Sequence, residues 1–342
     1  MKINVLHIIA DINVAVAGQH VLSLHQNMDA DIKALVPKGS RLEQFYKSHE
    51  LPCVTYTDIS AVKQAIKENV PDIVHTHTSH ELRTIAGKIG KVKTVHTQHS
   101  AISLGFFAKL SSGGLSDAVI ATTRETYESL VQTGTPARKI RMIYNGVAAV
   151  EKHDIEAGSK IKSQLNIPKD SFVVTCFSDI TKCGIILDTA KELPYNVIVL
   201  LADVPGEQKL ALLERIKNDN LQNVRILDEI NNINELIGIT NVQVSSRHDT
   251  TLLPLFAGMS AGKPIIATKD FDPNIIQDGV NGLVIAEFNA EELDDAITRL
   301  KENPPLYEEL SAKALSRYKE RFSAQRMARE VEELYQSIVG RK

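Results

Sequence analysis

Short apolar segments rich in β-branched residues alternate with helical segments along most of this chain, and this alternation limits the fold more than any other feature. Strands that are apolar on both faces, with helices between them, are typical of parallel sheets covered on both sides. We therefore predict an α/β fold class built from two Rossmann-like parallel-sheet domains. The predicted strands are residues 3–9, 32–36, 73–77, 94–97, 118–122 and 140–144, followed by residues 172–175, 196–202, 224–227, 242–245 and 265–268.

The alternation is interrupted between residues 148 and 170, where the chain is polar, and we interpret this stretch as a linker with one short helix. A length of 342 residues suits two domains. We predict an N-terminal domain over 1–150 and a C-terminal domain over 151–320, facing each other across a cleft. Residues 321–342 form a helical tail, whose apolar residues recur at helical spacing and give one stripe.

Composition excludes several classes of function. The formal net charge is −3, so the chain offers no basic surface for a nucleic acid. Three scattered cysteines are too few for a disulfide framework and indicate a reducing compartment. The N-terminal apolar run is interrupted by Asn4 and His7 and fits a buried strand better than a signal peptide. These features predict a cytoplasmic protein.

The segment from residue 245 to residue 268 carries a pattern of its own. It consists of a strand end, a loop, a helix that begins near Leu252, a turn at residues 261–264 and a second strand. In doubly wound sheets ligands bind at such strand–loop–helix junctions, because the carboxyl ends of the strands meet there.

Several further segments accompany that pattern in a fixed order. They are DIVHTH at 72–77, VHTQHS at 95–100, KIRMIYNGV at 139–147, IQDGVNGLV at 276–284 and RFS at 321–323. Together they resemble the retaining GT-B glycosyltransferases of the group 1, family 4 type. The resemblance implies that the N-terminal domain lies on the acceptor side, that the C-terminal domain binds a nucleotide-sugar, and that the tail packs back on the N-terminal domain.

The same resemblance implies roles for individual residues. His99 occupies the position of a histidine near the transferred sugar, Lys182 that of a cation that stabilises the departing diphosphate, and Asp249 that of a carboxylate beside the donor sugar. These three are the candidate catalytic residues. The candidate donor-binding residues are Gly18, Lys182, Gly184, Asp249, Thr250 and Thr251.

Four positions depart from the family's pattern. Phe177 stands where the family has a second phosphate-binding cation, and Ala257 where it has a carboxylate for the ribose hydroxyls. Thr250 and Leu252 replace two loop glycines. Because each departure weakens the expected donor site, a catalytically inactive homologue that acts as a partner or regulatory subunit remains the alternative to an active transferase.

Five histidines between residues 75 and 99 raise the hypothesis of a metal site. No acidic or thiolate ligand accompanies them at a matching spacing, and the resembled family holds no structural metal there. We predict that no metal is bound and that His75 is a hydrogen-bonded core residue.

The predicted function is the transfer of a hexose, with retention, from a UDP- or GDP-linked sugar to a glycan or lipid-linked acceptor. No other cofactor is expected. The resemblance implies polysaccharide biosynthesis, in which peripheral contact with a membrane and association with a partner glycosyltransferase would both fit. A nucleotide-sugar epimerase on the same fold is a third, less favoured interpretation.

Overall fold

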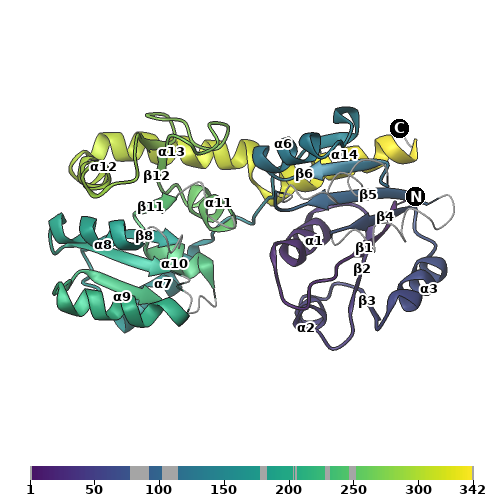
Figure 1. Cartoon of the computed structure of the whole chain (residues 1–342), viewed down its shortest axis with the longest axis horizontal. Helices are drawn as coiled ribbons and strands as arrows, with labels where there is room; N and C mark the ends of the chain where they lie inside the picture. The colour runs from purple at the N-terminus through teal and green to yellow at the C-terminus, as the bar shows by residue number, and fades with distance from the viewer. Residues whose placement is uncertain are drawn as a thin grey trace. The chain divides into compact units, whose positions relative to one another are not determined.

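The computed structural model describes residues 2–77, 92–101, 115–177, 183–202, 204, 206–227, 232–245 and 252–340. The chain divides into two α/β units (Figure 1). Unit 1 comprises Met1–Gly146 together with Ala324–Lys342, and unit 2 comprises Val147–Ser323.

Unit 1 is built on a parallel sheet with the strand order β3-β2-β1-β4-β5-β6-β7 among the described residues. Helices on both sides of the sheet bury its apolar strands, as the sequence pattern predicts. The strands are β1 (Asn4–Ile8), β2 (Asp31–Pro37), β3 (Cys53–Tyr56), β4 (Ile73–Thr76), β5 (Lys93–Gln98), β6 (Ala118–Ala121) and β7 (Ile140–Met142). The helices are α1 (Val16–Asn27), α2 (Arg41–Ser48), α3 (Ile59–Asn69), α6 (Arg124–Gln132) and α14 (Ala324–Val339), with a 3-10 turn at Ala137–Lys139.

Unit 2 repeats the design with the parallel order β10-β9-β8-β11-β12-β13 in the part of the chain that the structure describes. Its strands are β8 (Phe172–Phe177), β9 (Val197–Ala202), β10 (Val224–Leu227), β11 (Val242–Ser245), β12 (Ile265–Thr268) and β13 (Gly282–Ile285). Its helices are α7 (Lys152–Gln164), α8 (Cys183–Glu192), α9 (Gly206–Asn218), α10 (Ile233–Ile239), α11 (Leu253–Ser260), α12 (Ala290–Glu302) and α13 (Pro304–Arg321).

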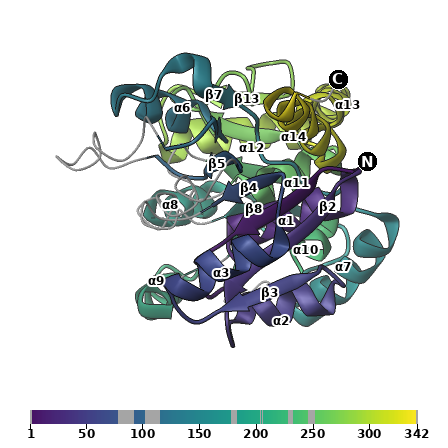
Figure 2. The ribbon, with the colours of Figure 1, turned by 90° about the vertical axis from the view of Figure 1, so that its right-hand side faces the viewer.

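The last helix belongs to unit 1 although it follows unit 2 in the sequence. Met327, Val331 and Tyr335 are fully buried in the same core as residues of β1 and α1. The backbone N–H of Gly146 also donates to the sulfur of Met327. The apolar stripe of the tail therefore covers the sheet of unit 1, where α14 is drawn in yellow (Figures 1 and 2).

The segment interpreted from the sequence as a linker is more ordered than expected. α7 has 13 residues and packs against α10 within unit 2. The two helices approach so closely that a Cβ on Gly158 would lie 2.6 Å from the carbonyl oxygen of Glu235. The polar composition of residues 148–170 therefore reflects one solvated helix face and not a flexible connection.

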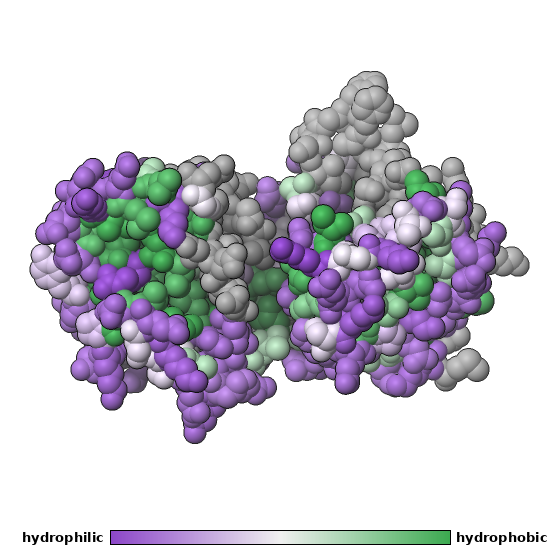
Figure 3. Space-filling view, turned by 90° about the horizontal axis from the view of Figure 1, so that it is seen from below, coloured by the Kyte–Doolittle hydropathy of each residue, from purple (hydrophilic) through white to green (hydrophobic). Residues whose placement is uncertain are grey.

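The surface view is dominated by polar side chains, with apolar areas between them (Figure 3). Among the described residues, none of the helices combines the length and the hydropathy that crossing a membrane requires.

Candidate functional site

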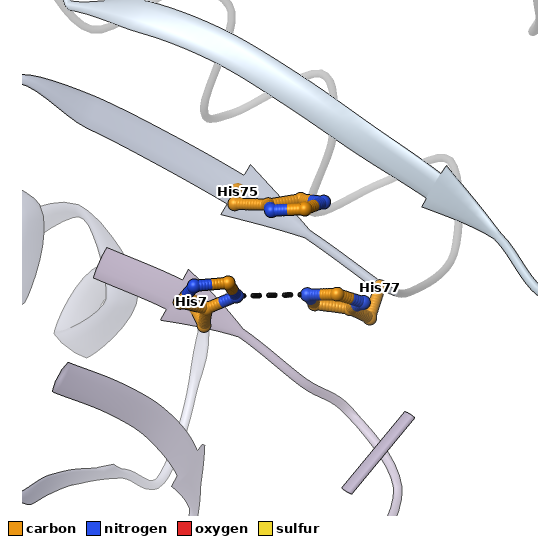
Figure 4. A group of neighbouring side chains, drawn as sticks. All are labelled: His7, His75 and His77. Atoms are coloured by element: carbon orange, nitrogen blue, oxygen red, sulfur yellow. Dashed lines mark hydrogen bonds between the residues drawn. The ribbon is translucent and has the colours of Figure 1, made fainter. Parts of the chain in front are cut away.

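A cluster of histidines lies at the carboxyl ends of the central strands of unit 1. β1 and β4 pair in parallel so that His7 is the register partner of His75. Neighbouring residues in register point to the same face of a sheet, and so does a residue two positions later. The rings of His7, His75 and His77 accordingly lie close together (Figure 4). His75 stacks on His77 with ring centroids 4.3 Å apart, and the ring of His7 is tilted by 36° to that of His75 at 4.8 Å.

Hydrogen bonds join these rings into a continuous chain. His75 bonds through Nε2 to the Thr97 hydroxyl at 2.7 Å and through Nδ1 to the Tyr335 hydroxyl at 2.5 Å. The same tyrosine hydroxyl lies 3.5 Å from Nε2 of His7. From there the chain continues through His7 Nδ1 and His77 Nε2 at 2.9 Å, and through His77 Nδ1 and His99 Nε2 at 3.1 Å.

At the His99 end of this hydrogen-bonded chain, two ring nitrogens have no partner among the described residues. Nδ1 of His99 and Nε2 of His20 are buried, and neither has a hydrogen-bond partner among the described residues. The ring of His20 stands nearly perpendicular to that of His99, with centroids 5.2 Å apart. The other nitrogen of His20, Nδ1, bonds to Oδ1 of Asn145 at 2.9 Å. Buried polar atoms without partners are uncommon and mark candidate ligand-binding positions.

Burial keeps the histidines of this cluster neutral. Desolvation, and to a smaller extent the charge of His20, lowers the pKa of His7 to about 3. Desolvation also lowers the pKa of His20 to about 4, although the bond to Asn145 acts in the opposite direction. The pKa values of His75, His77 and His99 are lowered well below the ordinary range, again mainly by burial. A low dielectric disfavours the imidazolium form.

His7, His75 and His77 are also the described residues best placed to hold a metal ion. Each offers one ring nitrogen, and these atoms lie within 4.8 Å of one another. Neutral imidazole is a good ligand for zinc, copper and nickel. However, binding an ion would break the hydrogen bonds that these ring nitrogens already make. This group also contains no carboxylate to offset the charge of the ion. The expectation that the histidines hold no metal stays a prediction.

In unit 2 the residues that directly follow β8 and β11 lie outside the described residues, and the helix that comes after β11, α11, is apolar. Every residue of α11 from Pro254 to Ser260 is buried, including Ala257. Phe256 stacks on Phe322 with ring centroids 4.2 Å apart. A Cβ on Gly258 would lie 1.7 Å from Oε1 of Gln243, so α11 sits directly on β11. Ala257 therefore fills a packed position and offers no polar group to a ligand.

Phe177, at the end of β8, also has a packing role. It lies against the small apolar cluster that contains Val173, Leu200 and Leu236. This position can thus be explained by core formation, and Phe177 makes an apolar contact where the resemblance implies a cation.

The sequence-predicted site residues fall into three groups. His99 belongs to the histidine cluster. Gly18 and Gly184 lie in the first turns of α1 and α8. Gly18 is buried, and a Cβ there would lie 2.7 Å from the Leu42 side chain, so packing alone accounts for this glycine. Gly184 accepts a hydrogen bond from Arg215 through its carbonyl oxygen. The remaining residues, Lys182, Asp249, Thr250 and Thr251, lie outside the described residues, as does His80.

The sequence interpretation of His75 is confirmed, because its ring is fully buried and both nitrogens are bonded. Four other members of the cluster were missed: His7, His20, Asn145 and Tyr335. A polar residue inside an apolar strand was the available signal for His7. His20, Asn145 and Tyr335 come from other parts of the chain, and no local pattern connects them to the strand ends.

Comparisons with known proteins identify the family. Residues 19–150 match the family model "Glycosyltransferase Family 4", and residues 159–317 match the model "Glycosyl transferases group 1". The chain therefore belongs to the group 1 glycosyltransferases with the GT-B fold.

One curated relative and two solved structures illustrate the likeness. An uncharacterized glycosyltransferase of Methanocaldococcus jannaschii is 23% identical over 301 residues, which are 79% of this chain and 76% of that protein. HepE of Anabaena, in complex with UDP and glucose, is 18% identical with a TM-score of 0.82 over 98% of this chain and 100% of its own. A glycosyltransferase from Rickettsia africae is 17% identical with a TM-score of 0.82 over all of both chains. At these identities the two structures establish the shared fold.

Proposed function

We propose that this protein transfers a hexose from a UDP- or GDP-linked sugar to a glycan or lipid-linked acceptor, with retention of configuration. The observation that carries the proposal is the histidine cluster at the strand ends of unit 1, where Nδ1 of His99 is buried without a partner among the described residues. A ligand group that bonds to this atom would remove the cost of leaving it unpaired. The family and the UDP–glucose complex of the HepE relative support a nucleotide-sugar as that ligand.

The proposed roles follow from the family pattern and from charge. Lys182 would stabilise the diphosphate as it departs, and Asp249 would contact the donor sugar. His99 would lie beside the reacting carbon; because it is neutral, it would act as a hydrogen-bond partner and not as a charge. Gly18, Gly184, Thr250 and Thr251 would line the donor, and no cofactor would be needed.

An apolar acceptor finds support in the loop between β1 and α1. Ile12 is 63% exposed and Val14 is 36% exposed, and this loop leaves the carboxyl end of a central strand. Exposed apolar side chains next to a candidate site suit the hydrocarbon part of a lipid-linked acceptor, or contact with a membrane surface.

Turnover of candidate donors tests the proposal. The protein would be incubated with UDP- and GDP-hexoses and with lipid-linked acceptors, and both the released nucleoside diphosphate and the anomeric configuration of the product would be measured. We expect release from one donor class and a product with the donor's configuration. An inverted product would reject retention, and no release from any donor would reject the transferase.

The second candidate is an inactive homologue that acts as a partner subunit. It is favoured by one observation, namely that Phe177 and Ala257 occupy packed apolar positions where a donor site needs polar groups. If the site has decayed, Phe177→Arg with Ala257→Glu should raise nucleotide affinity, because each change returns a charge-assisted contact. In an active transferase with an altered donor, the same pair should abolish turnover by burying unpaired charge.

A further inference from the structure

The hydrogen-bonded chain between Thr97 and His99 has a direction. A neutral imidazole carries one N–H donor and one acceptor nitrogen. A ring that accepts on one nitrogen must therefore donate from the other, and each ring passes this polarity to the next. The four histidines of this hydrogen-bonded chain, His7, His75, His77 and His99, are buried, and burial keeps them neutral.

The end of the hydrogen-bonded chain at Thr97, which we call the inner end, selects one of the two directions. The Thr97 side chain is buried, and its hydroxyl has one partner among the described residues, Nε2 of His75. If Thr97 donates, the bond is complete and His75 Nδ1–H donates to the Tyr335 oxygen. In the opposite direction His75 would donate to Thr97, and the buried hydroxyl hydrogen of Thr97 would have no acceptor among the described residues. Nδ1 of His99 has no partner among these residues in either direction, so the two directions differ by the unmet hydroxyl of Thr97, which disfavours the opposite direction by roughly tenfold.

The selected direction then runs outward. Tyr335 O–H donates to Nε2 of His7, His7 Nδ1–H donates to Nε2 of His77, and His77 Nδ1–H donates to Nε2 of His99. His99 is left with its own proton on Nδ1. This is the atom that has no partner among the described residues.

We propose that Thr97 and Tyr335 set the tautomer of His99, so that its unpartnered Nδ1 presents an N–H donor to the ligand. Tyr335, which lies on the C-terminal helix α14, is then a positioning residue that acts on His99 through His7 and His77. The functional meaning of this tautomer rests on the proposed function, because that function places His99 beside the transferred sugar.

His20 has the complementary tautomer. Oδ1 of Asn145 can only accept, so Nδ1 of His20 carries the proton and Nε2 is an acceptor. A donor on His99 and an acceptor on His20 therefore lie on neighbouring rings, both without partners in the described part of the chain. This pair suits a hydroxyl group, which accepts one hydrogen bond and donates another. A sugar hydroxyl has that chemistry, whereas a phosphate oxygen would meet only the donor.

Nitrogen NMR of the full chain tests the proposal. Histidines labelled with ¹⁵N are observed at pH 7.5, where long-range ¹H–¹⁵N spectra distinguish protonated from unprotonated ring nitrogens, and a His99→Asn variant assigns the His99 signals. In the wild type we expect His99 to carry its proton on Nδ1 with at least roughly tenfold preference. In Tyr335→Phe, and independently in Thr97→Val, the preference should fall toward an equal mixture.

Two matched variants serve as controls. Tyr318→Phe removes the hydroxyl of another buried tyrosine, one that donates to Val147 in unit 2. Thr76→Val removes a hydroxyl that bonds to His96, and His96 is not a member of the hydrogen-bonded chain that links Thr97 to His99. Both should leave the His99 signals unchanged.

A wild-type His99 protonated on Nε2 would overturn the proposal, as would variants that leave its tautomer unaltered. If Tyr335→Phe does not fold, Thr97→Val alone decides. The measurement needs no nucleotide-sugar, so its outcome is separate from that of the donor turnover experiment.

Discussion

The described parts of the two units are held together in opposite ways. Unit 1 places buried histidine rings at the carboxyl ends of its central strands, whereas unit 2 packs the apolar helix α11 against β11. Leaving a buried ring nitrogen without a hydrogen bond costs free energy, so unit 1 depends on partners as far apart in sequence as His75 and Tyr335. Unit 2 depends on close packing, as between Gly258 and Gln243. Unit 1 should therefore be sensitive to protons and to lost hydrogen bonds, and unit 2 to added volume.

The largest effect is expected from deletion of residues 324–342. This change removes Met327, Val331 and Tyr335 from the core of unit 1 and takes the Tyr335 hydroxyl from the hydrogen-bonded histidine chain. Burial of each large apolar side chain is worth about 1.5–3 kcal/mol. The loss approaches the whole stability of a domain, about 5–15 kcal/mol. We expect aggregation, measured by size-exclusion chromatography, while a chain that ends at Gly340 should elute at the same volume as the full-length protein. A soluble, equally stable deletion would contradict the assignment of α14 to unit 1.

Acid should weaken unit 1 before unit 2. In the unfolded chain His7 and His20 bind protons as the pH falls below about 6.5. In the folded chain they do so only near pH 3 and pH 4, respectively. Their contribution is therefore present above pH 6.5 and is lost as the pH falls toward those values. The cost is about 1.4 kcal/mol per pH unit for each histidine.

Hydrogen exchange with mass spectrometry at pH 7.5 and pH 5.0, corrected for intrinsic rates, would measure this effect. We expect protection to fall in β1, β4 and β5 and to persist in β8, β11 and β12. Equal loss in both units would remove the proposed difference between them.

Added volume should weaken unit 2. In Gly258→Ala the new methyl group would overlap the amide of Gln243, whose Nε2 donates to the carbonyl oxygen of Pro254. Overpacking and the lost hydrogen bond outweigh the gain in helix propensity, so we expect a loss of about 2–3 kcal/mol in the free energy of unfolding. Urea denaturation measures it. The control is Gly206→Ala, because a Cβ there meets no atom of the described residues within 4 Å, and its stability should stay near that of the wild type.

Much of this comparison could be predicted from the sequence. Apolar, β-branched runs predicted the central strands of both sheets, and the helical spacing of apolar residues predicted the C-terminal helix. β3 and β13 were missed, because Cys53–Tyr56 is a half-buried edge strand and Gly282–Ile285 follows directly on a turn. The histidine chain was beyond local patterns, since Asn145 meets His20 across 125 positions. Long-range hydrogen bonds leave no periodic trace in a sequence.

The smallest of the expected effects concerns ligand affinity. Lys182→Ala should weaken nucleotide-sugar binding by roughly 10- to 100-fold, the effect of one charge-assisted contact, and should leave the melting temperature unchanged. Lys169→Ala is the control, because Lys169 is an exposed lysine of the same unit. Calorimetry would measure both affinities. An unchanged affinity in Lys182→Ala would remove this lysine from the proposed site.

Titration of the wild-type protein with UDP, GDP and ADP tests the proposed donor site most directly. If the chain is a transferase for UDP- or GDP-linked hexoses, one of these two nucleotides should bind with a submillimolar Kd and a stoichiometry near one, and ADP should bind more weakly. If UDP and GDP both bind no better than ADP, at millimolar affinity or below detection, the donor site is absent and the transferase account is contradicted.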